Sequence, residues 1–263
     1  MNKKNLSIFV VIVLALAGGV FVYRDMRGTK GPQETTTATT TTTTIGGVQM
    51  TGDGKVTIVP VSPKKLPPAP SLVRSTDFKN TLTPEIKTIV VARINVNVEA
   101  LKKDPKNLEN WIMLGVNRKT IGDYEGARDA WEYVKALNPN DVVAWNNLGD
   151  LYHFYLKDYK KSEENWKRTI MLNPKYVQGY RGLVELYTYS MKEKLGEIPA
   201  LLKEGISKNP DAVDLQVFLA RYYKDRGDVA LAKKAYGDAI VSAERLNNTT
   251  LVATLKADLA MVK

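Results

Sequence analysis

Side chains that could carry out chemistry are scarce in this sequence. It has a single histidine, His153, and no cysteine, so disulfides, thiolate metal sites and cysteine nucleophiles are excluded. The zinc-protease pattern HExxH and the serine-hydrolase pattern GxSxG are absent, and no spacing of acidic residues implies a shared pocket. A lone imidazole on a helix is more often a packing or groove residue than a general base. The sequence therefore predicts a protein that is not an enzyme and that uses no cofactor and no metal.

One short string has the look of a phosphate-binding loop. Gly54-Lys55 would be its centre, but Gln49 stands where the first glycine of such a loop is needed, and Val56 replaces the required serine or threonine. The segments VQM and VTIV on either side are apolar and β-prone, so Gly52-Asp53-Gly54 could instead turn a short hairpin. Two isolated strands of this length would be marginally stable.

The net charge of +10 is unevenly distributed along the 263 residues. Residues 1–30 carry +4 and residues 31–83 carry +2, whereas residues 84–263 hold 28 basic and 24 acidic groups. The excess of cations therefore lies mainly in the N-terminal third, where it suits a membrane surface. The remaining charges have mixed signs, as on solvated helix faces, and form no dense basic block. Nucleic acid is not an expected partner.

An apolar segment lies close to the N-terminus. Residues 6–23 form 18 consecutive uncharged positions, which as a helix would reach about 27 Å, near the thickness of the hydrocarbon core of a bilayer. We expect a single-pass membrane anchor within residues 1–30. The alternative is a cleaved signal peptide, because Ala15-Leu16-Ala17 matches the small-x-small cleavage pattern. We expect the bulk of the chain to be extracytoplasmic in either case.

Residues 31–83 have the composition of a disordered linker. A run of threonines follows Glu34, and it cannot bury enough apolar surface to offset the entropy of ordering. Five prolines between positions 60 and 70 favour extended polyproline geometry further along.

An internal repeat occupies the rest of the chain. Asp104-Pro105, Asn138-Pro139, Asn173-Pro174 and Asn209-Pro210 recur at spacings of 34, 35 and 36. The same spacings separate four leucines, Leu114, Leu148, Leu183 and Leu219. They also separate the larger residues three positions before these leucines, Trp111, Trp145, Tyr180 and Gln216. Large residues at i, i+3 and i+7 share one face of a helix, and the closing proline ends the second helix of each unit.

Two further helices should flank the repeats. Thr83-Pro84-Glu85 is a helix start and Pro105 follows a helix stop, which predicts a helix over residues 84–103. Because Ile94, Val96 and Val98 alternate with asparagines, a strand is the competing interpretation. Leucines spaced by four residues from Leu251 predict a capping helix over residues 249–262, which would close the exposed end of the core.

The repeat pattern resembles the tetratricopeptide repeat (TPR), a helix–turn–helix unit. The resemblance implies an all-α solenoid over residues 84–263, with repeats at about 108–141, 142–176, 177–212 and 213–246, preceded by the membrane anchor and the linker. It places all four tryptophans at core positions. Arg118 stands where tyrosine is usual in the first repeat, and Gln216 stands where a large apolar residue is usual in the fourth.

The resemblance also implies a concave groove lined by the first helix of each repeat, along which a peptide or helix of another protein binds. Ile112 and Val116 occupy the positions of the lysine and asparagine that clamp a carboxylate tail in one TPR subgroup, so such a ligand is not expected. The peptide-groove residues carried over by alignment are Asn146, Asp150, His153, Phe154, Arg181, Glu185, Tyr189, Arg221 and Lys224. Arg181 and Arg221 are expected to favour an acidic or mixed segment.

These features together predict a membrane-anchored TPR scaffold for protein–protein interaction, with a role in assembly of the cell envelope. The alternative is a structural spacer or a self-associating module with no distinct partner.

Overall fold

The computed structural model describes residues 43–45, 48–50, 56–58 and 66–263, so the expected membrane segment at residues 6–23 lies outside the described residues. The chain divides into two compact units, residues 1–64 and 65–263. In the described part of the first unit, β1 (Thr43–Ile45), β2 (Val48–Met50) and β3 (Val56–Ile58) form an antiparallel sheet in the order β1-β2-β3, with Val48 opposite Ile58. The two segments that the sequence indicated as a possible hairpin are thus paired as β2 and β3, and a third strand precedes them.

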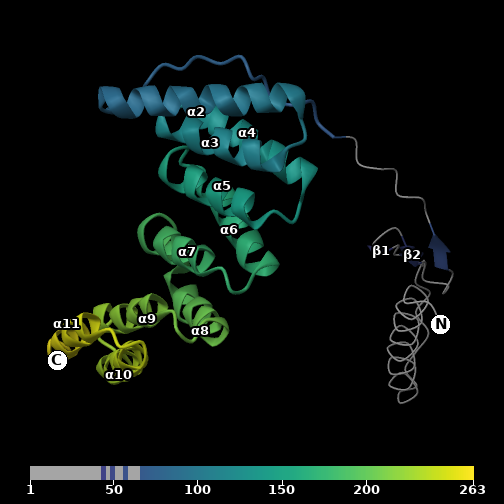
Figure 1. Cartoon of the computed structure of the whole chain (residues 1–263). Coiled ribbons are helices and arrows are strands. Elements are labelled where there is room, and N and C mark those ends of the chain that lie inside the picture. The colour runs from purple at the N-terminus through teal and green to yellow at the C-terminus, as the bar shows by residue number, and fades with distance from the viewer. Residues whose placement is uncertain (1–42, 46–47, 51–55, 59–65) are drawn as a thin grey trace, which may run out of the picture. The chain divides into compact units, whose positions relative to one another are not determined.

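From Pro84 onward the second unit consists of helices joined by short connections (Figure 1). Its helices are α2 (Pro84–Lys103), α3 (Leu108–Thr120), α4 (Tyr124–Leu137), α5 (Val142–Phe154), α6 (Tyr159–Leu172), α7 (Val177–Tyr189), the 3₁₀ helix η1 (Lys192–Glu197), α8 (Ile198–Lys208), α9 (Val213–Asp225), α10 (Val229–Arg245) and α11 (Thr249–Ala260). Helices α3/α4, α5/α6, α7/α8 and α9/α10 form successive pairs, and each pair packs on the next. None of the helices described is long and apolar enough to cross a membrane.

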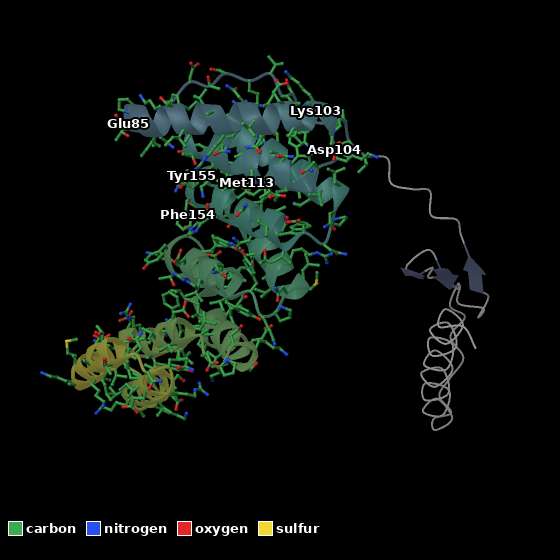
Figure 2. All side chains as sticks on the ribbon, viewed as in Figure 1. Glu85, Lys103, Asp104, Met113, Phe154 and Tyr155 are labelled. Carbon is green, nitrogen blue, oxygen red and sulfur yellow. The ribbon has the colours of Figure 1, made fainter. Side chains whose placement is uncertain are left out.

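Both flanking helices form as expected. The side chain of Thr83 caps α2 by accepting a hydrogen bond from the amide of Ile86, and Glu85 and Lys103 lie at opposite ends of the helix (Figure 2), where their charges oppose the helix dipole. The strand interpretation of residues 89–98 is therefore wrong. Helix α11 packs on α10 and covers the last repeat, which confirms the capping helix.

Short polar side chains begin most of these helices. Asn107, Asp123, Asp141 and Asp158 accept a hydrogen bond from a backbone amide in the first turn of α3, α4, α5 and α6, respectively. Between the two helices of the first repeat, Gly122 adopts a φ of +84°, a conformation that most other residues adopt only at a cost. Capping and turn residues thus set the period of the solenoid.

The core consists of two apolar clusters, one from α2 to α5 and one from α6 to α11. Trp111, Trp131 and Trp166 are buried, as expected from their repeat positions. Trp145 is not: it is only partly buried, and its ring centroid lies 3.8 Å from the ammonium of Lys135 and 5.8 Å from the guanidinium of Arg168. The expectation that all four tryptophans are core residues is wrong for Trp145, because these two cations, rather than apolar residues, flank its ring.

The repeat unit begins earlier than the sequence indicated. Residues 66–83, which we expected to belong to the linker, lie within the second compact unit, and alternate residues from Leu72 to Leu82 are half-buried. We call residues 71–82 the strap. The backbone amide of Lys79 donates to the carbonyl of Ile121 (2.8 Å), and the side-chain amide of Asn80 donates to the carbonyl of Thr120 (3.0 Å).

Arg118 explains why the strap lies there. It is 2% exposed, and its guanidinium donates to the carbonyl of Ser75 in the strap at 2.6 Å. Asp123 lies 3.5 Å from Arg118 and accepts two hydrogen bonds from Arg74 of the strap. A buried arginine needs such partners, because an unpaired buried charge costs several kcal/mol, on the order of 3–5. Arg118, which replaces the usual tyrosine of the repeat, thus finds its hydrogen-bond partner in the strap, a segment outside the repeats.

Candidate peptide-binding groove

The expected groove residues all lie on the first helices of the last three repeats: α5 carries four of them, α7 three and α9 two. Their side chains do not form one continuous surface. The structure brings some together around a hollow between α7 and α9, pairs others in ion pairs, and buries one in the core.

Near α3 and α5 the expected groove charge of Asp150 is neutralised by a lysine of α3. The ammonium of Lys119 binds the carboxylate of Asp150 and lies 4.9 Å from the ring of Tyr155. Phe154 and Tyr155 follow one another at the end of α5 (Figure 2), and both are about 40% exposed. This part of the surface therefore offers aromatic contact and little free charge.

His153 is a packing residue rather than an exposed groove contact. It is 3% exposed, its Nε2 lies 2.9 Å from the hydroxyl oxygen of Ser190 beyond α7, and its ring lies 5.6 Å from that of Trp166. Burial lowers the pKa of His153, and the nearby cation Lys157 lowers it further. The neutral imidazole thus joins α5 to the end of α7. Asn146 also points inward, since its Oδ1 is buried and accepts no hydrogen bond from any described residue.

A concavity lined by residues of the first helices lies between α7, η1 and α9, and we call it the α7–α9 hollow. Its volume is about 380 Å³, within the range of ligand-binding clefts. The expected groove residues Glu185, Tyr189 and Arg221 line it together. Tyr189 is 72% exposed, so its ring is available to a partner. The hollow is lined by Val184, Glu185, Thr188, Tyr189, Leu195, Ile198, Phe218, Arg221, Tyr222, Asp225 and Arg226.

The two arginines expected to dominate the groove differ in position. Arg221 lines the α7–α9 hollow, and its guanidinium lies 3.7 Å from Asp258 of α11. Arg181 does not line the hollow, and its guanidinium lies 3.5 Å from the carboxylate of Asp214. Both pairs are long and largely solvated, so each is weak. Lys224 is half-buried on α9 and does not line the hollow either.

Sequence reasoning did not include Arg226 or Leu195 among the groove residues, although both line the α7–α9 hollow. Arg226 directly follows α9, and its guanidinium lies 5.6 Å from the ring of Tyr222, which lines the same cavity. Leu195 belongs to the two-residue insertion that distinguishes the third repeat, and it lies in η1. That insertion was a visible signal, since extra residues between paired helices must project somewhere. Among the residues that the structure describes, no group of three or more histidine or acidic side chains could hold a metal ion.

The architecture is that of an α-solenoid, in which antiparallel helix pairs stack on their neighbours. Its unit of about 34 residues, with a large residue, a leucine and a closing proline, identifies the described helices as a tetratricopeptide-repeat fold.

Solved structures agree with this fold. A crystal structure of MamA superposes with a TM-score of 0.53 at 23% sequence identity, covering 62% of this chain and 94% of that one. A tetratricopeptide repeat protein from Parabacteroides merdae gives 0.51 at 16% identity, with 68% of each chain covered. PilF of Pseudomonas aeruginosa gives 0.50 at 14% identity, covering 66% and 85%. No protein-family model matches the sequence, and no curated protein matches it.

Proposed function

We propose that this protein is a non-enzymatic scaffold that binds a segment of another protein in the α7–α9 hollow. The observation that supports this most directly is the meeting of Tyr189, Arg221 and Glu185 around one open cavity. An exposed aromatic ring and an arginine are the side chains that contribute most often to binding hot spots.

The chemistry of the α7–α9 hollow favours a mixed segment. Its floor is apolar, with Val184, Leu195 and Phe218, so an aliphatic or aromatic side chain of the partner would be buried there. Its rim carries both signs of charge, from Arg221 and Arg226 and from Glu185 and Asp225. The cations are held only by long pairs or by stacking, so an acidic residue next to the buried side chain completes the match.

We also propose that residues 6–23 hold the chain at a membrane and that the repeats lie on the extracytoplasmic side, in assembly of the cell envelope. Support for this is the 18-residue uncharged segment flanked by basic residues, followed by a threonine- and proline-rich stretch typical of tethers. Protease added to intact cells with an accessible surface should remove the repeat unit. Complete protection of the repeats would place them in the cytoplasm.

The experiment for the binding role is site-specific photo-crosslinking in cells. A photoreactive phenylalanine analogue placed at Tyr189 should join the chain to a distinct protein, and the joined species should weaken when Arg221→Ala is added at unchanged thermal stability. The matched control is the same analogue at Met171, which is 60% exposed on α6 and lies outside the α7–α9 hollow. If position 189 crosslinks only to a second copy of this chain, the spacer or self-association alternative is supported instead.

A further inference from the structure

Helix α2 packs on the repeats as the second helix of a repeat does. Second helices contact the first helix of the following repeat, as α4 contacts α5 and α6 contacts α7, and α2 contacts α3 in the same way. Asp104 ends α2 just as Asn138, 34 residues later, ends α4. Yet α2 is the outermost helix at its end of the repeats (Figure 1), and the strap, rather than a first helix, directly precedes it in the chain. Helix α2 is therefore a second helix that lacks the first helix of its own pair.

The face that such a first helix would cover is exposed on α2. In α4 this face consists of residues that are at most 1% exposed: Ala127, Ala130, Trp131 and Val134. It lies against α3, where the indole of Trp131 donates to the carbonyl of Ile112 at 3.1 Å. Of the equivalent residues 34 positions earlier in α2, Arg93 is exposed and Val96 is 67% exposed. Ile89, on the same side of α2, is 49% exposed. The repeat architecture thus indicates that a helix fits this face.

A hollow between α2 and α3 lies where this helix would pack. Its volume is about 300 Å³, and we call it the α2–α3 hollow. It is lined by Ala92, Arg93, Val96, Asn97, Met113 and Asn117. Met113 of α3 is equivalent to Asn147 of α5, which lies in a cavity with residues of α3 and α4. A first helix paired with α2 would therefore contact α3 at Met113, as α3 approaches α5 at Asn147.

An arginine without an ion pair occupies the middle of the exposed face of α2. Glu99 and Lys102 pair with each other at 2.6 Å, whereas Arg93 forms no ion pair with any residue that the structure describes. Ser162 of α6 stands at the same repeat position as Arg93, and its hydroxyl donates to the carbonyl of Gly149 at 2.8 Å. Gly149 is the eighth residue of its first helix. An acidic side chain at the eighth position of an incoming helix would therefore meet Arg93.

The end of the solenoid has room for a side chain at that eighth position. In the first repeat the eighth residue is Gly115, and a Cβ added there would lie 2.3 Å from the ring of Trp131. The same holds in the second repeat for Gly149 and Trp166, at 2.6 Å. In α2 the residue equivalent to these two tryptophans is Asn97, which has no large ring. A helix on α2 therefore does not need glycine there and can carry aspartate or glutamate instead.

We propose that the exposed face of α2 binds a helix of a partner protein, which completes the pair that α2 lacks. The helix has about the 13 residues of α3, α5, α7 and α9 and runs antiparallel to α2. It turns an apolar face toward Ile89, Val96 and Met113, and it presents an acidic residue to Arg93. A second copy of α2 fits less well, because an antiparallel pair with Ile89 opposite Val96 would bring two Arg93 side chains together. This surface is separate from the α7–α9 hollow, so the two proposals stand or fall independently.

The test titrates the purified full-length chain into a fluorescein-labelled peptide and follows the fluorescence anisotropy. The probe is DVVAWNNLEDLYHF amide, which is the segment of residues 141–154 with the change Gly149→Glu. This segment is chosen because α5 already has the face with which a first helix packs on a second helix. A second peptide carries Gly149→Lys instead. We expect saturable binding of the glutamate peptide and about 10-fold weaker binding of the lysine peptide.

Three variants of the full-length chain locate the binding. Arg93→Glu should reverse the preference, so that the lysine peptide binds more tightly than the glutamate peptide. Val96→Asp places a charge in the apolar face and should weaken the glutamate peptide by about 10-fold or more. Val241→Asp is the matched control, because Val241 is 65% exposed on α10, and it should bind as the wild type does. All three positions are exposed, so the melting temperature should stay level.

The proposal is overturned if the wild type shows no saturable binding, if Arg93→Glu leaves the preference unchanged, or if Val96→Asp binds the glutamate peptide as tightly as the wild type. Sedimentation of the full-length chain without peptide tests a second copy as the occupant. We expect the same mass for the wild type and for Val96→Asp. A dimer that Val96→Asp converts to monomer would show that a second copy covers α2, and it would also overturn the proposal.

Discussion

The hydroxyl of Tyr187 on α7 donates a 2.8 Å hydrogen bond to the carboxylate of Glu163 on α6, and both residues are buried. The same carboxylate oxygen binds the ammonium groups of Lys167 on α6 and Lys194 on η1. Burial by itself would raise the pKa of Glu163, but the hydrogen bonds from Lys167, Lys194 and Tyr187 outweigh it and lower the pKa to about 2. This carboxylate therefore joins the second repeat to the insertion that shapes the α7–α9 hollow.

Replacing Glu163 by glutamine should destabilise the repeat unit. The change removes the charge that binds two lysines and leaves a weaker acceptor for Tyr187, which should lower the free energy of unfolding by about 2 kcal/mol. Glu164→Gln, at the exposed neighbouring position, is the matched control and should change stability by less than about 0.5 kcal/mol. Urea denaturation of the two variants would decide, and equal midpoints would contradict the role of Glu163.

The effect of Glu163 should also depend on pH. Its pKa is near the ordinary 4.5 in the unfolded chain and about 2 in the folded one, so the stability that it contributes is complete above about pH 4.5 and is lost as the pH falls toward 2. The gap between wild type and Glu163→Gln should therefore be largest at pH 6 and should narrow at pH 3. Urea midpoints at the two pH values measure it, and a constant gap would mean that the carboxylate is not the cause.

The sequence predicted the repeating part of the fold well because its signals are local. The proline period, the leucine positions and the caps at Thr83 and Asn248 each act within one or two turns, and α2 and α11 begin where those signals placed them. The strap was missed because its partner, Arg118, is 43 residues away from Ser75. Alternation of Leu72, Phe78 and Leu82 at even spacings was the available signal for an extended, half-buried segment.

The candidate site was harder to predict than the fold. Alignment identified which residues lie on the first helices, but it could not show that Ser190 and Trp166 enclose His153. Nor could it show that α11 brings Asp258 to Arg221. The repeat pattern determines which residues lie on the first helices. How exposed each side chain is, and with which charge it pairs, depends on residues of neighbouring repeats and insertions, so the sequence of one repeat does not predict it.

The strap should stabilise the repeats through Arg118. A fragment of residues 66–263 should unfold at a higher temperature than a fragment of residues 84–263, because removal of the strap takes away the Ser75 carbonyl that accepts from Arg118 and the Arg74 guanidinium that binds Asp123. Calorimetry of both fragments, with and without Arg118→Leu, forms a double-mutant cycle. The benefit of the strap should shrink by about 2 kcal/mol in the Arg118→Leu pair. An undiminished benefit would show that Phe78 and Leu72 hold the strap without Arg118.

Two tryptophans at equivalent repeat positions should differ in their contribution to stability. Trp111 is 1% exposed and packs edge-on against Tyr133 at 5.1 Å, so Trp111→Ala should cost about 3–5 kcal/mol. Trp145 is partly exposed beside two cations, so Trp145→Ala should cost only about 1–2 kcal/mol. Guanidinium denaturation followed by circular dichroism measures both. Equal losses would mean that Trp145 is as much a part of the core as Trp111.

Arg221 should contribute more to partner binding than Arg181, although the repeat alignment treats them alike. Arg221 lines the α7–α9 hollow with Tyr189, whereas Arg181 lies outside it beside Asp214. Once a partner has been captured through position 189, Arg221→Ala should weaken its binding about 10-fold, which corresponds to about 1.4 kcal/mol, and Arg181→Ala should weaken it less than 3-fold. Both residues are exposed and their ion pairs are long, so the melting temperature should move by less than about 2 °C in either variant. Calorimetric titration of the purified partner into each variant gives the comparison.

If Arg181→Ala has the larger effect, the partner lies nearer Asp214 than the α7–α9 hollow. If either variant loses binding together with stability, that arginine is structural and its assignment to the binding surface is wrong.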